Sequence, residues 1–347
     1  MRTNLREISA PLTDAKPTVM GGRNWGYVFA LLGTILFSMK AILVKLIYQP
    51  TEGMALNSLD AITVMALRIG FSMPVYIGVF WFVTRRRKAE GREPIKLKDA
   101  VLGALLGMLG YYVCTWLDVE GLKYVTSQLE RLLLFTYPVF VFIFGAMFFG
   151  KPLTKWAILA IGLAYAGIGV IFLGGEIAVG ENVPLGAAMI LFCAALFALF
   201  QLFAKPMIGR LGSSLFTCCA MLGAGTMIFI HFMTENMVTG QLSTSLDLPA
   251  RIWGLGIVLA LFSTLLPSFL VNIAIGRIGP QATAAMGMLS PIATIVLAIW
   301  WLGEPFGLID ALGTFLTLLG IGLYTWFDKR SKSSQLSSSL ATNKQSQ

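Results

Sequence analysis

Five ionisable side chains lie inside long apolar stretches of this sequence: Lys40, Lys45, Arg68, Glu130 and Arg131. A charge in a membrane-spanning segment is costly, and such residues usually face the interior of a helix bundle or a water-filled pathway. The planar guanidinium of arginine is well shaped to bind carboxylate or phosphate through two hydrogen bonds. The pattern therefore predicts a buried site for an anionic or carboxylate-bearing small molecule, with Lys40, Arg68, Glu130 and Arg131 as ligands.

Glu130 and Arg131 are neighbours in the run T-S-Q-L-E-R-L-L-L-F-T-Y-P. Adjacent residues of a helix point about 100° apart, so we expect these two to be poorly placed to pair with each other. At a rise of about 1.5 Å per residue they lie roughly 5 Å below the outer membrane edge, whereas Lys40 and Arg68 lie about 12 Å below it. Lys45 is close enough to the edge to extend its ammonium group to the surface. We expect Glu130 to pair with Lys40 or Arg68, which leaves two cations free to face a substrate.

Two structural interpretations of the same charges remain open. All four deeper charges could form a buried ionic network that only fixes the register of the helices. Glu130 and Arg131 could instead lie at the wet outer rim of the protein. If Arg131 belongs to a substrate site, replacing it by Gln should abolish the activity of the protein while the protein remains folded.

Other polar and helix-breaking residues add weaker candidates. Gln128 and Gln281 stand near the starts of two spanning segments, where a helix cap or an interhelical bond is as good an explanation as substrate contact. Gln201 stands alone in the apolar run A-L-F-A-L-F-Q-L-F-A-K and could face the same site. Pro138 and Pro291 interrupt helices and are candidate hinges, although adaptation of packing explains them equally well.

The composition excludes several classes of protein. Only 12% of the 347 residues are charged and 56% are apolar, whereas a soluble domain carries about 25% charged residues. This balance is typical of an all-α integral membrane protein. One histidine and four scattered cysteines indicate no metal or cofactor site, and the cysteines are expected to be free and buried. The net charge of +9 indicates cytoplasmic loops rather than a nucleic-acid partner.

A catalytic role is not expected. The run G-A-M-F-F-G-K-P at 145–152 resembles a phosphate-binding loop, but Pro152 offers neither the hydroxyl nor the backbone N–H that such a loop needs. A membrane-embedded enzyme would need a nucleophile with a base, or metal ligands, at membrane depth. The single histidine, His231, stands near the end of a segment instead.

Ten apolar segments are long enough to span a membrane, each about 20 residues. They cover 26–48, 61–83, 100–117, 127–149, 156–174, 185–204, 214–233, 253–275, 281–302 and 308–327. The expected organisation is a cytoplasmic tail at 1–24, one unit at 25–174, a second at 175–328, and a disordered cytoplasmic tail at 329–347. The expected surroundings are the lipid bilayer and a small-molecule substrate, and no pattern indicates an oligomeric state.

The distribution of basic residues predicts the orientation. The connection between the second and third segments, T-R-R-R-K-A-E-G-R-E-P-I-K-L-K-D, holds seven basic residues and is therefore expected in the cytoplasm. Alternation then places both termini in the cytoplasm and 20 of the 26 Lys and Arg residues on that side. The expected location is the inner membrane of a bacterial cell.

The two units repeat each other weakly. An offset of 153 residues aligns equivalent positions without a gap: Gly103 with Gly256, Gln128 with Gln281, Pro138 with Pro291, Gly150-Lys151-Pro152 with Gly303-Glu304-Pro305, and Gly167 and Gly169 with Gly320 and Gly322. Because five segments is an odd number, the second unit is expected to be inverted in the membrane. Inverted repeats are typical of secondary transporters, whose substrate site lies between the halves near the midplane.

The second unit ends S-P-I-A-T-I-V-L-A-I-W-W-L-G-E-P-F-G-L-I-D-A-L-G-T-F-L-T-L-L-G-I-G. The proline, the G-E-P turn and the closing G-x-G resemble the EamA domain of the drug/metabolite transporter superfamily, over about residues 25–327. Arg68 matches the arginine that this family tends to place in its second helix, and Glu304 matches the acidic residue of the last turn. Lys151 departs from the pattern, because many first repeats carry Glu there.

The resemblance implies two EamA repeats, a central cavity, and alternating-access transport of small metabolites, often as efflux. Together with the buried cations, it favours anionic or amino-acid-like substrates. Two alternatives remain open: an exporter of neutral or cationic drug-like compounds, and a membrane protein without transport activity.

Overall fold

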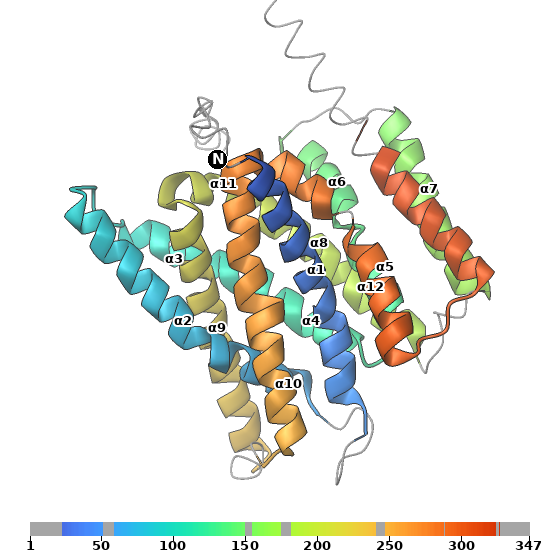
Figure 1. The fold of residues 1–347 in the computed structure, drawn as a ribbon, viewed down its shortest axis with the longest axis horizontal. Helices are drawn as coiled ribbons and strands as arrows, with labels where there is room; N and C mark the ends of the chain where they lie inside the picture. The colour runs from blue at the N-terminus through green and yellow to red at the C-terminus, as the bar shows by residue number, and fades with distance from the viewer. Residues whose placement is uncertain are drawn as a thin grey trace, which may run out of the picture.

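The computed structural model describes residues 23–50, 59–149, 155–174, 182–240, 247–287, 289–323 and 326, and within these ranges the chain is helical and contains no strand. The helices pack into a bundle (Figure 1). In chain order they are α1 (Arg23–Tyr48), α2 (Ala61–Ala89), α3 (Leu97–Gly107), η3 (Met108–Val113), α4 (Cys114–Gly121), α5 (Ser127–Leu134), α6 (Tyr137–Phe149), α7 (Lys155–Gly174), α8 (Val183–Leu211), α9 (Ser213–Val238), α10 (Ala250–Ala260), η4 (Leu261–Leu265), α11 (Leu266–Gly287), α12 (Ser290–Leu297), η5 (Ala298–Leu302) and the last helix, Leu308–Leu323.

Each of the ten predicted segments contains helix in its described part, but several helices extend beyond the predicted bounds and two segments are organised differently. Among the described residues, six helical stretches are long and apolar enough to cross a membrane. The fourth segment is divided into α5 and α6, and α11 runs without a break through 276–280, where a connection was expected. Pro280 removes one helical hydrogen bond, yet the helix continues past it. α11 packs extensively along α1.

The repeat inferred from the sequence is visible in the irregular parts of the helices. The π-helical turns η3 and η4 begin at Met108 and Leu261, which are equivalent positions. The helices α6 and α12 begin at Tyr137 and Ser290, which are equivalent as well. Each of these two helices starts one residue before a proline, so both halves interrupt their fourth segment at the same place.

The contacts between helices follow a reciprocal pattern. α1 packs on α11, and α8, which corresponds to α1 in the second half, packs on α3 and α4. α2 packs on its equivalent α9, and α5 packs on α12. This reciprocity is what two similar halves related by a pseudo-two-fold axis produce.

Glycines allow the closest of these approaches. A Cβ atom on Gly107 would lie 1.9 Å from the carbonyl oxygen of Ala220, so α3 and α9 meet backbone to backbone. The G-A-L-L-G run at 103–107 therefore serves packing within the chain. At one edge of the bundle, α7 lies beside the last helix (Figure 1), where a Cβ on Gly167 would lie 2.5 Å from the carbonyl oxygen of Gly313.

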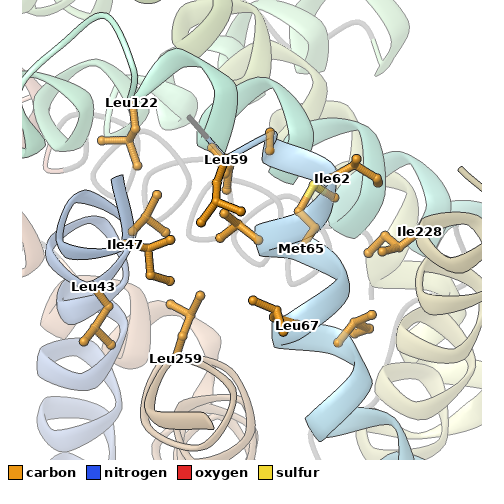
Figure 2. Close-up of a cluster of buried hydrophobic side chains, with 14 of the residues drawn as sticks. Leu43, Ile47, Leu59, Ile62, Met65, Leu67, Leu122, Ile228 and Leu259 are labelled. Carbon is orange, nitrogen blue, oxygen red and sulfur yellow. The ribbon is translucent and has the colours of Figure 1, made fainter. Parts of the chain in front are cut away.

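The largest buried apolar cluster joins the two halves. Figure 2 shows side chains of α1, α2, α9 and α10 meeting there, including Leu43, Met65, Ile228 and Leu259. These four side chains are almost fully buried. The core thus fixes α1 and α2 against the second half and sets the place of the charges that they carry.

Candidate functional site

The short helix α5 carries the two adjacent charges of the fourth segment. It begins after Thr126, whose hydroxyl accepts a hydrogen bond from the backbone N–H of Leu129 at 3.3 Å. It ends after two turns, because Phe135 and Thr136 form a turn before α6. α5 packs on α1 of the first half and on α8 and α12 of the second. Glu130 is 0% exposed within the protein and Arg131 only 7%, so neither lies at a wet outer rim.

Lys40 of α1 lies between two buried carboxylates. Its ammonium group forms an ion pair with Asp118 of α4, and it lies 3.8 Å from Glu130 Oε1. Asp118 is 1% exposed. A cation and two carboxylates from three helices are thus held together away from water, where removing one partner leaves an uncompensated charge.

Arg131 extends the same cluster. Its Nε lies 3.6 Å from Glu130 Oε2, and its Nη2 donates a hydrogen bond to the carbonyl oxygen of Phe37 at 3.3 Å. Glu130 therefore directs one carboxylate oxygen toward Lys40 and the other toward Arg131.

Arg68 of α2 is buried beside α4, which carries Asp118. Its Nη2 donates to the hydroxyl of Thr115 at 3.4 Å, and Asp118 is close enough to act on its charge. Arg68 is 7% exposed and forms no ion pair within 4.0 Å among the residues that the structure describes. Its guanidinium is therefore compensated only in part.

The cluster as a whole carries more positive than negative charge. It holds three cations (Lys40, Arg68 and Arg131) and two carboxylates (Asp118 and Glu130). Several of their buried atoms have no hydrogen-bond partner among the described residues: Arg68 Nε, Arg131 Nε, Asp118 Oδ1 and both carboxylate oxygens of Glu130. Buried polar groups are normally satisfied, so these atoms, although some of them lie in ion pairs, still have capacity to hydrogen-bond a small polar molecule or water.

One expectation from the sequence is wrong. Glu130 and Arg131 do interact, because the arginine side chain is long enough to fold back across the 100° between them. Despite the different depths expected for their positions, the side chains of Lys40 and Glu130 meet, with Nζ and Oε1 3.8 Å apart. The expected pairing of Glu130 with Lys40 is confirmed.

Asp118 is the residue of this site that the sequence reasoning missed. The apolar third segment ends at Leu117, and the carboxylate was assigned to the following connection. The helix in fact continues to Gly121, so Asp118 stays in the bundle. The absence of a helix breaker between Asp118 and Gly121 was the signal available in the sequence.

The three glutamines have different surroundings. The side chain of Gln128 is buried and donates through Nε2 to the carbonyl oxygen of Pro305 at 3.2 Å. Gln201 is half-buried and hydrogen-bonds to Tyr137, at the start of α6. Gln281 belongs to α11, but its side chain lies outside the described part of the chain.

The two prolines lie at the helix interruptions. Pro138 follows the first residue of α6, and Pro291 follows the first residue of α12. The start of α12 meets α1 next to the Arg131 contact: Ser38 Oγ lies 2.9 Å from Ser290 Oγ and also donates to the Ser290 carbonyl oxygen at 3.2 Å. The interruption in the second half therefore adjoins the charge cluster.

Comparison with known proteins identifies the family. The model of the EamA-like transporter family matches residues 24–173 and, a second time, residues 184–326. An "Uncharacterized transporter YcbK" of Bacillus subtilis (strain 168) is 28% identical over 288 residues, which are 83% of this chain and 88% of the relative. A "Probable terminal-alkyne amino-acid exporter" of Streptantibioticus cattleyicolor is 27% identical over 236 residues, 67% of this chain and 75% of the relative.

A solved crystal structure shares the fold. It superposes with a TM-score of 0.55 over 89% of this chain and 99% of its own, at 14% sequence identity. At that identity the likeness extends to the fold alone.

Proposed function

This chain belongs to the EamA-like transporter family, and on that basis we propose that it is a secondary transporter of small carboxylate-bearing metabolites, amino acids included. It is an integral membrane protein, as its apolar helices and its family require. Beyond membership of the family, we propose a substrate class, a binding site and a transport mechanism.

The observation that carries the proposal is the excess positive charge of the buried cluster. Arg68 and Arg131 each keep an Nε–H without a hydrogen-bond partner among the described residues. A substrate carboxylate can accept two parallel hydrogen bonds from such a guanidinium. Binding one carboxylate would neutralise the cluster, which lowers the electrostatic penalty of its burial.

The carboxylates of the cluster extend the proposal to amino acids. Asp118 and Glu130 keep acceptor oxygens without hydrogen-bond partners in the described structure. A zwitterion offers a carboxylate to the arginines and an ammonium group to these oxygens. The relative named as a probable amino-acid exporter supports the same class and, by its name, export as the direction.

The site residues of the proposal are Lys40, Arg68, Asp118, Glu130 and Arg131, with Gln128, Gln201 and Gln281 as weaker candidates. The five charged residues belong to the first half, while α8 and α12 of the second half pack against α5 beside them. Interrupted helices at the substrate site are typical of transporters with inverted repeats. Rocking of the halves around this site would expose it to each side of the membrane in turn, with Pro138 and Pro291 as hinges.

A counterflow assay tests the proposal. Purified protein is reconstituted into liposomes loaded with an unlabelled amino acid or a mono- or dicarboxylate, and uptake of the labelled compound is followed. We expect uptake for at least one compound of this class, a loss of at least tenfold in Arg131→Gln, and normal uptake in Arg210→Gln, whose side chain is 47% exposed. Uptake of cationic or neutral compounds alone, undiminished in Arg131→Gln, would contradict the assignment, as would uptake of no compound at all.

A further inference from the structure

Glu304 links the two halves of the molecule. It follows η5 in the second half and lies against the N-terminus of α5 in the first half. Its Oε1 accepts a hydrogen bond from the backbone N–H of Ser127 at 2.9 Å, and its Oε2 accepts one from Gln128 at 3.3 Å. One carboxylate therefore binds the first two N–H groups of the helix that carries Glu130 and Arg131.

Thr126 and Glu304 share the capping of α5. The first N–H groups of a helix have no partner within the helix. At α5, the N–H of Leu129 goes to the Thr126 hydroxyl and that of Glu130 to the Thr126 carbonyl oxygen. The remaining two, on Ser127 and Gln128, are fully buried and go to Glu304. A negative charge at this end also interacts favourably with the helix dipole.

The backbone of the second half is shaped for this contact. Gly303 has φ +64, in the left-handed region, and this ends η5 and turns the chain toward α5. The next residue but one, Pro305, accepts the Gln128 side chain at 3.2 Å. The G-E-P turn thus holds α5 through two groups: the side chain of Glu304 and the backbone carbonyl oxygen of Pro305.

The symmetry-related pair of positions, Lys151 in the first half and Gln281 in the second, differs from the Glu304–α5 contact. The position equivalent to Gln128 is Gln281, which lies in the continuous helix α11, so no new helix begins there to be capped. This agrees with the sequence, which has Lys151 in place of a carboxylate, although Lys151 itself lies outside the described residues. The carboxylate is thus present in the turn that packs against the N-terminus of a helix, where the backbone N–H groups need an acceptor.

We propose that Glu304 is a positioning residue of the transport site: it holds α5 so that Glu130 and Arg131 meet Lys40, and its bond to α5 forms and breaks as the halves move. This inference rests on the proposed transport function. α5 is a two-turn unit bounded by the cap on one side and by the turn at Phe135–Thr136 on the other. At the capped end, the side chain of Glu304 and the carbonyl oxygen of Pro305 both come from the opposite half, so relative motion of the halves acts on α5 directly.

The polar groups around the cap support the breaking of this bond. Ser127 Oγ and Gln128 Oε1 are buried and have no hydrogen-bond partner among the described residues. Leaving a buried polar atom unsatisfied is unfavourable. A second conformation, in which the cap is released and water reaches the start of α5, would satisfy both atoms.

The test combines hydrogen–deuterium exchange with transport kinetics for Glu304→Ala and Glu304→Gln. We expect the amides of Ser127 and Gln128 to exchange at least tenfold faster in Glu304→Ala, while peptides of α2 and α9 exchange as in the wild type. We expect the maximal rate of counterflow to fall at least tenfold. Glu304→Gln keeps one acceptor oxygen. Its amide exchange rate and its maximal counterflow rate should therefore lie between those of the wild type and those of Glu304→Ala. Glu120→Gln is the control, because Glu120 pairs with Lys123 and, among the described residues, forms no ion pair with α5.

The possible failures are distinguishable. Unchanged exchange in Glu304→Ala, or faster exchange with wild-type KM and maximal rate, overturns the positioning role while the transport function stands. A wild-type protein that carries no compound of the proposed class overturns the transport function and, with it, the role of Glu304. Faster exchange throughout the bundle would show that Glu304 only stabilises the fold, which also overturns the proposal.

Discussion

Lys40 shows how closely the buried charges depend on one another. It contacts Asp118 and Glu130, while Arg131 contacts the other oxygen of Glu130. Exposed ion pairs contribute little to stability, but these groups are enclosed by helices of both halves. Because a buried ion pair is weak evidence for a gain in stability, the proposed role in binding offers a reason for their presence in an apolar bundle.

A double-mutant cycle tests the coupling of Lys40 and Asp118. Each single variant, Lys40→Met or Asp118→Leu, leaves a buried charge without its partner and should destabilise the protein by about 3–5 kcal/mol. The double variant should recover most of that loss, as measured by unfolding of the purified protein in detergent. Additive losses would show that the two groups do not form a pair.

At the scale of single residues, the sequence predicted four of the buried charges but not Asp118 and not all of the contacts. Lys40, Arg68, Glu130 and Arg131 were recognisable because each interrupts an apolar run. Asp118 was not, since it stands at the end of such a run, where a helix and a connection look alike. The cap from Glu304 requires knowing which turn of the second half lies against α5, and no local pattern specifies that.

Among the elements, the fifth helices of the two halves depend on glycine. Gly167 and its equivalent Gly320 both lie where α7 meets the last helix, and Thr317 Oγ1 donates to the carbonyl oxygen of Ala164 at 3.2 Å across the same contact. Helices in a membrane associate mainly through such close packing, because lipid provides no hydrophobic drive between them.

Two glycines of α7 provide a matched comparison. Gly167→Ala would place a methyl group 2.5 Å from the carbonyl oxygen of Gly313, and overpacking of this kind costs about 1–3 kcal/mol. A Cβ on Gly169 meets nothing within 4 Å, so Gly169→Ala should leave the melting temperature unchanged or raise it slightly. Equal melting temperatures for the two variants would show that α7 and the last helix do not pack as described.

The sequence predicted most of the elements but not their irregularities. Runs of apolar residues marked the helices, and Pro138 and Pro291 marked the interruptions of the fourth segment in each half. The π-helical turns η3 and η4 have no such marker, since packing against neighbouring helices decides where an extra residue is accommodated. The continuation of α11 through Pro280 depends in the same way on its contact with α1.

Across the whole molecule, the charge cluster and its surroundings lie where the two halves meet. Cys114 of α4 and Cys193 of α8 also lie on this boundary, and both are free and buried, as expected from the sequence. Each thiol contacts the other's carbonyl oxygen: Cys114 Sγ donates to Cys193 O at 3.7 Å, and Cys193 Sγ to Cys114 O at 3.1 Å. A bond between them would join the halves.

Oxidative cross-linking tests whether the halves must move. Copper phenanthroline with oxygen should convert the two thiols to a disulfide and reduce counterflow to background, and dithiothreitol should restore it. Cys193→Ala should be insensitive to the oxidant, although Cys218 and Cys219 remain. Normal transport by protein that mass spectrometry shows to be cross-linked would contradict alternating access between these halves.

The most direct test of the central claim, that the buried cluster is the substrate site, is ligand-dependent thermal stabilisation of the purified protein and of Arg131→Gln. A ligand present at about 100 times its dissociation constant should add about 2.7 kcal/mol to the stability of the protein, a shift that is readily measured. The account predicts stabilisation of the wild type by amino acids or other carboxylates and its disappearance in Arg131→Gln, with Arg210→Gln unaffected. Stabilisation by these ligands that persists in Arg131→Gln, or stabilisation by cationic and neutral compounds alone, would contradict it.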